Sequence, residues 1–358
     1  MKNRNFWKNK TVLITGHTGF KGSWMTLVLK SLGANVVGYA LNPISKPNFF
    51  DNLKLTKFLK KDYRNNILDK KKLDQALDRY KPSIIFHLAA QSSVLVSYKN
   101  PIDTIMANVL GTSNLLESCK NKKFIRSIVV VTTDKVYLNL NQNKKFKEED
   151  KLGGLDIYSG SKAACEIISE SYMHSFFKNT KTNVATVRSG NCIGGGDWTK
   201  DRILKDCAIL CLKNKKLFIR SPNSTRPWQH VLEPIFGYLK LAQKLYFDKS
   251  KSYSTSWNFG PSRKKNMKVI EIAKFTKNFL KSKSKIIIKS HHLHESKYLA
   301  LDSTKSMRRL KWKTHLTDKD AIQMTLEWFK NYYNFKRRKD LLKLSYEQIN
   351  KVKKLNNF

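Results

Sequence analysis

The chain has few acidic residues and no long hydrophobic run. Its 358 residues include 27 aspartates and glutamates against 69 lysines and arginines, which gives a formal net charge of +42. No apolar segment approaches the roughly 20 residues of a membrane-spanning helix. No apolar stretch follows the charged first residues, as it would in a signal peptide. We therefore expect a cytoplasmic protein that has no membrane partner.

Cysteine is also scarce. The five cysteines are Cys119, Cys165, Cys192, Cys207 and Cys211. Their odd number and the lack of a CxxC pair argue against a disulfide framework and for buried free thiols. Cys207 and Cys211 are at helical spacing, but no matching pair of His or Cys residues completes a zinc site. We expect both to pack in the core, and we expect no metal.

The large positive charge would by itself suggest nucleic-acid binding. The lysines, however, are spread over many expected loops and helix surfaces and do not form one stripe with aromatic side chains. We therefore expect no nucleic-acid partner, although a polyanionic nucleotide ligand would benefit from the positive field. The main lysine-rich segments are 57–61, 70–72, 144–147, 213–216 and 281–285.

Patterns typical of strands alternate with patterns typical of helices as far as about residue 188. This alternation predicts parallel strands joined by crossover helices, an α/β fold with a Rossmann-type, doubly wound parallel sheet. Beyond that point the pattern becomes irregular, and we expect a smaller C-terminal lobe. The expected strands are 11–15, 35–39, 83–87, 127–132 and 183–188, and the expected helices are 21–32, 70–80, 102–120 and 157–177.

The segment GHTGFKG, residues 16–22, lies between the first expected strand and the first expected helix. Glycines here permit a tight turn and let a pyrophosphate approach the backbone, where free N–H groups and the helix dipole favour a phosphate. An ordinary glycine-rich turn is the alternative. Because both position and context match, we expect a dinucleotide site. Its cofactor-binding residues would be Gly16, Thr18, Gly19, Phe20, Lys21 and Gly22.

An acidic residue normally ends the second strand of such a fold and binds the adenosine ribose. Here the corresponding segment is ALNP, residues 40–43. No basic residue directly follows that would bind a 2′-phosphate, so the sequence favours NAD over NADP. We expect ribose contacts from Asn42 or Ser45.

The segment YSGSK, residues 158–162, places a phenol and an ammonium four residues apart at the start of an expected helix. Both side chains then share one face. A lysine nearby favours the phenolate, which would let Tyr158 take a proton from a sugar hydroxyl during hydride transfer beside Lys162. Taken alone, the segment is better explained as a solvated helical pair, and only the other motifs favour the catalytic interpretation.

The fourth expected strand delivers Thr133, Asp134 and Lys135 to the carboxyl edge of the sheet. Open parallel sheets bind ligands at this edge. Thr133 can share a hydrogen bond with a substrate hydroxyl and with Tyr158. Asp134 can act as an acid, and Lys135 as an acid or base if burial lowers its pKa.

The third expected strand leads into HLAAQ, residues 87–91. Its small residues, Ala89 and Ala90, would let the chain pass close beneath a cofactor. His87 has apolar neighbours and no evident carboxylate partner, so we expect a packed, hydrogen-bonded side chain and not a catalyst.

Together these motifs resemble the extended short-chain dehydrogenase/reductase superfamily, and within it the nucleotide-sugar 4,6-dehydratases, from residue 8 to about residue 333. The segments TDK (133–135), GNCIGGGDW (190–198) and RPWQHV (226–231) are most similar to the branch that acts on CDP-glucose. In the dTDP-glucose and GDP-mannose branches an acidic residue is typical where this chain has Lys135. The missing acid after the second strand also fits the CDP-glucose branch.

The resemblance implies conversion of CDP-D-glucose to CDP-4-dehydro-6-deoxy-D-glucose and water, with NAD as cofactor regenerated in each turnover. Tyr158, helped by Thr133 and Lys162, would deprotonate the C4 hydroxyl while hydride leaves C4. Lys135 would remove the C5 proton and Asp134 would protonate the departing C6 oxygen, before hydride returns to C6. Which of these two residues handles which proton stays open, because coupled groups share their protonation states.

The resemblance also implies contacts to the substrate. Asn191 would hold a phosphate or sugar oxygen, and Arg226 would offer a bidentate fork to the diphosphate. Trp198 could line the pocket or pack in the core. The implied substrate-binding residues are Gln91, Asn191, Trp198 and Arg226, while Tyr158, Lys162, Asn42, Ala89 and Ala90 would also contact the cofactor.

We expect residues 1–188 to form the NAD-binding domain, together with a returning segment near 232–260. The substrate-binding lobe would comprise 189–231 and 261–334. The basic segment 335–358 would be a helix that docks on this chain or on a partner, or a frayed tail.

The superfamily implies a homo-oligomer, a dimer or tetramer, built through the helices near 102–120 and 157–177. Two other functions stay open. One is a dehydratase or epimerase for another nucleotide-hexose, although simple 4-epimerisation needs no acid at C6. The other is a non-catalytic nucleotide- or RNA-binding protein.

Overall fold

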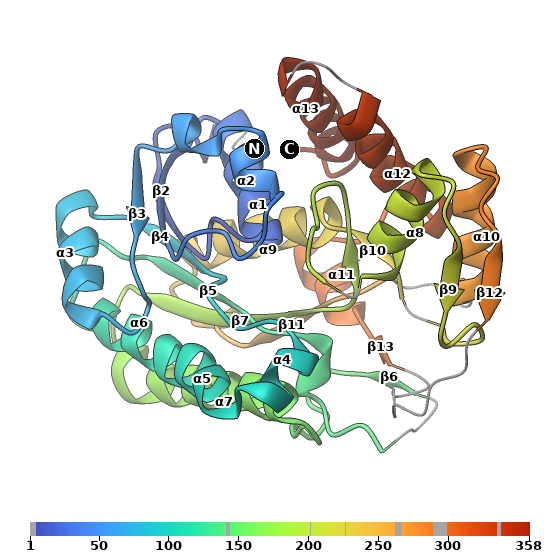
Figure 1. Ribbon diagram of the computed structural model, residues 1–358. Helices are drawn as coiled ribbons and strands as arrows, with labels where there is room; N and C mark the ends of the chain where they lie inside the picture. The colour runs from blue at the N-terminus through green and yellow to red at the C-terminus, as the bar shows by residue number, and fades with distance from the viewer. Residues whose placement is uncertain are drawn as a thin grey trace.

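The computed structural model describes residues 5–140, 144–200, 202–225, 227–261, 267–288, 299–334 and 338–358. Within them, seven parallel strands form one sheet in the order β11-β7-β5-β4-β1-β2-β3 (Figure 1). The order runs outward in both directions from the β4/β1 pair, so the predicted doubly wound α/β fold is confirmed. The strands are β1 (Thr11–Thr15), β2 (Asn35–Ala40), β3 (Lys61–Arg64), β4 (Ile84–His87), β5 (Ser127–Val131), β7 (Asn183–Ser189) and β11 (Ser256–Phe259).

Helices cover both faces of this sheet. The helices α3 (Lys70–Tyr80), α6 (Gly111–Cys119) and α7 (Ile157–Tyr172) pack on one face. The helices α1 (Phe20–Ser31) and α9 (Leu232–Phe247) pack on the other face. Every residue of β4 and β5 is consequently buried, which is why these strands are continuous apolar runs without polar alternation.

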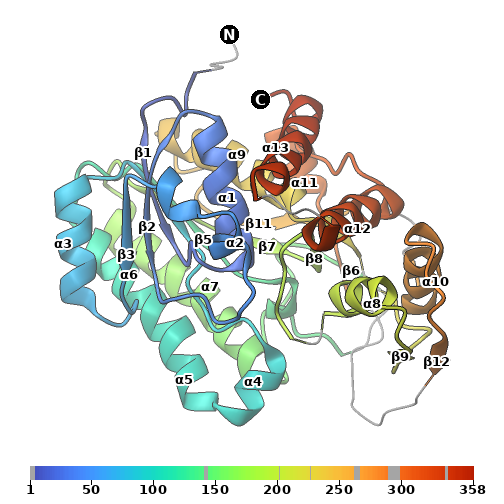
Figure 2. The ribbon, with the colours of Figure 1, turned by 45° about the horizontal axis from the view of Figure 1, so that its top comes forward.

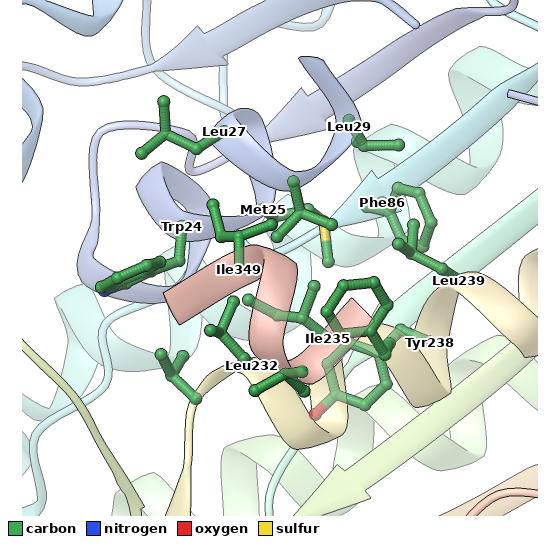
Figure 3. Packing of buried hydrophobic residues seen from close by; sticks show 14 of the residues in the cluster. Trp24, Met25, Leu27, Leu29, Phe86, Leu232, Ile235, Tyr238, Leu239 and Ile349 are labelled. Atoms are coloured by element: carbon green, nitrogen blue, oxygen red, sulfur yellow. The ribbon is translucent and has the colours of Figure 1, made fainter. Parts of the chain in front are cut away.

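The basic C-terminal segment docks on this same chain. Its described part forms α13 (Arg338–Leu355). Figure 3 shows Ile349 of α13 close to Trp24 of α1 and to Ile235 of α9. Ile349 is fully buried, and Phe358 packs its ring 5.1 Å from that of Phe236 in α9. This helix therefore completes the core on the α1/α9 face of the sheet.

A second group of elements, called the lobe here, lies beside the sheet in both views (Figure 1, Figure 2). It contains α8 (Ile203–Leu212), α10 (Val269–Phe279) and α12 (Asp318–Asn334), with β9 (Leu217–Ile219) paired to β12 (Ile286–Ile288). Cys207 and Cys211 are buried in its small apolar cluster, as expected, and all five cysteines are free thiols.

Short elements complete the described chain. Two small parallel pairs join β8 (Cys192–Ile193) to β10 (Gln229–His230) and β6 (Lys145–Phe146) to β13 (Ala300–Leu301). The remaining elements are α2 (Phe49–Asn52), η1 (Leu55–Phe58), α4 (Val94–Lys99), α5 (Pro101–Ile105), η2 (Met106–Leu110), η3 (Asp134–Val136), η4 (Met173–Phe177) and α11 (Thr304–Leu310). In the part of the chain described, no helix is apolar and long enough to cross a bilayer.

Two details differ from the sequence pattern. The strands β3 and β11 are not among the predicted strands. The sequence of β3, KDYR, has no apolar run, and β11 is a four-residue segment in the region where the pattern is irregular. Each lies at one edge of the sheet and pairs with a single neighbour, β2 or β7. The expected helix 102–120 contains the π-helical turn η2 between α5 and α6. A π-helical turn inserts one extra residue and often marks a functional site.

Candidate active site

The glycine-rich loop connects β1 to α1 at the carboxyl edge of the sheet. Gly16 has a φ of +75° and donates its N–H to Tyr39 O at 2.9 Å. An added Cβ there would lie 2.6 Å from Ala89 N, so only glycine fits. Gly19 caps α1 without any side-chain hydrogen bond, and the space around its missing Cβ is open except for Gly16 O. The first N–H groups of α1 are therefore available to a phosphate.

The polar side chains of this loop bind the protein itself. Thr18 donates its hydroxyl to Leu41 O at 2.9 Å, which ties the loop to the end of β2. Lys21 is turned inward and donates to Ser189 Oγ at 2.8 Å and to Tyr238 at 3.3 Å. Burial disfavours its charge, but Cys192 and Tyr238 outweigh burial and raise the pKa of Lys21 above its usual range. That Thr18 and Lys21 contact the cofactor stays a prediction.

The edge of the sheet beyond the glycine loop carries a partly buried polar cluster. Asp62 of β3 accepts hydrogen bonds from His17 at 2.8 Å and from Arg64 at 2.7 and 2.8 Å. Burial would raise the pKa of Asp62, but these donors hold it well below its usual range. Burial also lowers the pKa of His17. Asn42, at the end of the β2 loop, is exposed.

The start of helix α7 places Tyr158 and Lys162 in its first two turns. Asp156 caps it by accepting from the N–H and hydroxyl of Ser159 at 2.9 and 2.6 Å. Tyr158 and Lys162 are then 7% and 6% exposed. Lys162 donates to Val131 O, the last residue of β5, at 3.2 Å. The two side chains are therefore buried at the carboxyl edge of the sheet, not solvated on a surface helix.

The segment Thr133, Asp134 and Lys135 follows β5 directly and packs against α7. One oxygen of Asp134 accepts from Thr133 Oγ1 at 3.0 Å and from Lys135 Nζ at 3.2 Å. The other oxygen is buried and has no hydrogen-bond partner among the described residues. Asp134 is 2% exposed, whereas one third of the Lys135 side chain reaches solvent. A carboxylate and an ammonium are thus held side by side in a turn that packs against α7, the helix that carries Tyr158.

The loop after β7 closes over this carboxylate. A Cβ added at Gly190 would lie 3.3 Å from the free oxygen of Asp134 and 3.4 Å from Pro227. Asn191 is half-buried on the same loop, and its carbonyl accepts from Gln229 N at 3.2 Å. Arg226, expected to bind the diphosphate, lies outside the described residues. The predicted substrate segments therefore meet the predicted catalytic segment at one place.

Gln91 and Trp198 contact other parts of the protein. The Gln91 amide donates to Thr104 Oγ1 at 2.9 Å and to Ser93 O at 3.0 Å. The Trp198 ring packs against Phe329 and Tyr332 of α12, with centroids 5.3 and 4.8 Å away. Contact of either side chain with a substrate remains a prediction.

Asn108 is a site residue that sequence reasoning missed. It lies in the π-helical turn η2, accepts from Gln91 N at 2.8 Å and donates to Ser161 Oγ at 2.9 Å. It thereby joins the loop after β4 to the helix that carries Tyr158. Its contacts connect residues 17 and 53 positions apart, which no local pattern reveals.

A buried ion pair beneath the site was also not predicted. Glu166 of α7 and Arg188 of β7 face each other through two hydrogen bonds of 3.0 Å. Thr132 and Thr186 donate their hydroxyls to the same carboxylate. Because Thr132 immediately precedes Thr133, the pair fixes the base of the catalytic segment. The only available signal is that Glu166 stands four residues after Lys162, on the same helix face.

His87 is packed and hydrogen-bonded, as expected. Its ring nitrogens contact Thr15 Oγ1 at 2.7 Å and Thr112 Oγ1 at 3.1 Å. Burial, with a smaller contribution from Lys162, lowers the pKa of His87 to about 3. Among the described residues, no cluster of His, Cys, Asp or Glu has the arrangement of a metal site.

Known proteins resemble this chain over most of its length. The family model described as GDP-mannose 4,6 dehydratase matches residues 13–325. A CDP-glucose 4,6-dehydratase of Salmonella typhimurium is 39% identical over 98% of both chains. A dTDP-glucose 4,6-dehydratase from Bacillus anthracis, solved in complex with NAD, has a TM-score of 0.76 at 22% identity and covers 93% of this chain and 99% of its own.

The fold is also shared with other nucleotide-sugar enzymes. A UDP-glucose 4-epimerase from Thermotoga maritima, solved with UDP-glucose, has a TM-score of 0.78 at 19% identity, over 90% of this chain and 99% of its own. At this identity the likeness establishes the fold alone.

Proposed function

We propose that this chain, which belongs to the GDP-mannose 4,6-dehydratase family within the extended short-chain dehydrogenases, converts CDP-D-glucose to CDP-4-dehydro-6-deoxy-D-glucose and water. The observation that carries this proposal is the turn that holds Asp134 and Lys135 side by side against α7, the helix that carries Tyr158. The name of the Salmonella relative, identical at 39% of positions, supports CDP-glucose as the substrate.

NAD is the proposed cofactor. The uncapped start of α1, the open space at Gly19 and the backbone of the loop after β4 fit a dinucleotide. When bound, NAD would supply the hydride acceptor for the sugar C4 and the donor for C6. Gly16 and Gly22 shape this loop, Ala89 borders it, and Ala90 would contact the cofactor from the same segment.

The protein's own residues would move the protons. Tyr158 would take the proton of the C4 hydroxyl, with Lys162 favouring its phenolate and Thr133 aligning the hydroxyl. The resulting ketone acidifies the C5 hydrogen, which Lys135 would remove as a neutral amine after it has passed a proton to Asp134 across their 3.2 Å contact. Asp134, whose free oxygen points to the covered side of the site, would protonate the departing C6 oxygen. Water leaves from C6 as a consequence.

This assignment divides the chain into a part that would bind the cofactor and a part that would bind the substrate. Residues 1–188 and the segment near 232–260, which contributes α9 and β11, would hold the cofactor. Residues 189–231 and 261–334 would bind the nucleotide-sugar, with Asn191 and Arg226 on phosphate or sugar oxygens.

A homo-oligomer is proposed from an exposed apolar face. The helices α4, α5 and α7 lie together on one side of the sheet (Figure 1). They expose Tyr98, Ile102 and Ile167 to 67%, 68% and 55%. A second copy of this chain would bury them. Light scattering should give at least a dimer, and Ile102→Lys should shift it toward the monomer.

The free thiols fit a cytoplasmic location.

Incubation with NAD and a panel of CDP-, dTDP-, GDP- and UDP-hexoses tests the function. We expect mass spectrometry to show loss of one water from CDP-glucose, with no net change in NAD. Preference for another nucleotide would overturn the substrate. Conversion to an isomer of unchanged mass would identify an epimerase.

A further inference from the structure

We propose that Arg64 makes the adenosine-ribose pocket of this chain tolerant of a 2′-phosphate, so that the pocket accommodates NADP as well as NAD. The inference rests on the cofactor site of the proposed function and names the residue that sets selectivity within it.

The position of Arg64 follows from strand register. In a doubly wound dinucleotide site, the residue about 20 positions beyond the glycine motif, at the end of the second strand, faces the ribose 2′ position. Here that residue is Ala40, the last residue of β2. Ala40 pairs in register with Arg64, the last residue of β3. The arginine is therefore the cross-strand neighbour of the ribose-facing position.

The guanidinium of Arg64 is held in place. Its Nε and Nη2 donate to the two oxygens of Asp62 at 2.7 and 2.8 Å. Its Cζ atom lies 4.7 Å from the ring centroid of Phe50 in α2. Asp62 is anchored in turn by the buried His17 at 2.8 Å. A guanidinium that is already ordered loses little conformational entropy when it binds a phosphate.

Arg64 also has hydrogen-bonding capacity left. Its side chain is 28% exposed. Within the described chain Nη1 makes no hydrogen bond, because only Nε and Nη2 contact Asp62. A 2′-phosphate beside Ala40 would accept a hydrogen bond from this N–H group.

The charges around the ribose position favour the same conclusion. Selectivity for NAD normally comes from an acid at the end of the second strand, which repels a 2′-phosphate. Ala40 cannot do this, and Leu41 after it is apolar and 57% exposed. The charge of Asp62 is balanced by Arg64, while the whole chain carries +42. The site lacks the group that excludes NADP and has one that binds it.

The test compares AMP with adenosine 2′,5′-bisphosphate, two ligands that differ only in the 2′-phosphate. Isothermal titration of the full-length protein should show the bisphosphate binding at least as tightly as AMP. Arg64→Gln should weaken the bisphosphate about tenfold and leave AMP nearly unchanged. NADP and NAD should follow the same order.

Lys61→Gln is the matched control. It removes the same charge from the same strand, but Lys61 lies on the opposite face, where its Nζ stands over Tyr63. The affinities of this variant for AMP and for the bisphosphate should stand in the same ratio as those of the wild-type protein. A wild-type protein that binds the bisphosphate more than about tenfold more weakly than AMP, or an equal loss in Lys61→Gln, overturns the proposal. The wild-type ratio decides even if Arg64→Gln does not fold. Failure of both ligands to bind would overturn the cofactor site itself.

Discussion

Lys135 holds its ammonium 3.2 Å from one oxygen of Asp134, while the second oxygen of that carboxylate is buried without a partner among the described residues. The lysine end of this pair reaches solvent, whereas the carboxylate end is enclosed under Gly190. Such an arrangement can take a proton from one carbon and give a proton to a leaving oxygen on the next. The following predictions depend on this geometry and on its support.

Tyr158→Phe and Lys135→Ala should block different steps. Without the phenol, the C4 hydroxyl is not deprotonated and no NADH forms. Without the Lys135 amine, C4 oxidation continues but C5 deprotonation slows, so NADH accumulates in a single turnover. Stopped-flow absorbance and exchange of the C5 proton with solvent deuterium separate the two. Lys151→Ala, at an exposed lysine, is the control. Wild-type exchange in Lys135→Ala would show that another residue is the base.

Glu166→Gln should destabilise the fold by about 3 to 5 kcal/mol, because it leaves Arg188 as a buried charge without its partner. The double variant Glu166→Gln/Arg188→Met should lose less, since it removes both charges. Urea unfolding followed by circular dichroism measures both. A loss below about 1 kcal/mol in the single variant would contradict the assignment of a buried, desolvated pair.

Gly195→Ala should cost about 1 to 3 kcal/mol of stability through overpacking. An added Cβ would lie 1.9 Å from Cγ of Trp328, whose ring also stacks on Phe49. Gly160→Ala is the matched control, because its nearest neighbour is 3.9 Å away and it lies inside α7. That change should be neutral or stabilise by up to about 1 kcal/mol. Equal thermal shifts for the two variants would contradict the packing argument.

Stability should fall as the pH is lowered below about 6.5. Burial lowers the pKa values of His87 and His230 to about 3 each. The unfolded chain binds a proton at each ring near pH 6.5, whereas the folded chain does not. The unfolded state therefore holds more protons between pH 6.5 and 3, and folding weakens as pH falls through that window. Between pH 6.5 and 5 this amounts to about 2 kcal/mol per histidine.

Urea midpoints at pH 7 and pH 5 measure this loss. His87→Gln should reduce the pH dependence, although it also removes packing at neutral pH. An unchanged midpoint across this range would show that the two rings are protonated in the folded protein.

The sequence predicted five of the seven strands, and it placed the candidate catalytic residues at the carboxyl edge of the sheet, because both are coded locally. Tyr158 and Lys162 are four residues apart, and Asp134 and Lys135 follow a continuous apolar strand. The supporting contacts are not local. Asn108 meets Ser161 across 53 positions, and Glu166 meets Arg188 between a helix and a strand. The inward turn of Lys21 toward Tyr238 likewise depends on α9, which only folding places there.

The edge strand β3 shows the same limit. Its four residues carry no periodic apolar signal, yet their register beside β2 brings Arg64 next to Ala40. The residues directly after β2 include no basic side chain, so the sequence alone does not reveal Arg64, which lies on the neighbouring strand β3.

The most direct measurement is the fate of a label at the sugar C4. CDP-glucose deuterated at C4 should give a product that has lost one water and carries the deuterium in its C6 methyl group, as nuclear magnetic resonance and mass spectrometry would show. In deuterated water, unlabelled substrate should gain one solvent deuterium at C5. A label retained at C4 in a product of unchanged mass, or lost to solvent, would contradict 4,6-dehydration by this site.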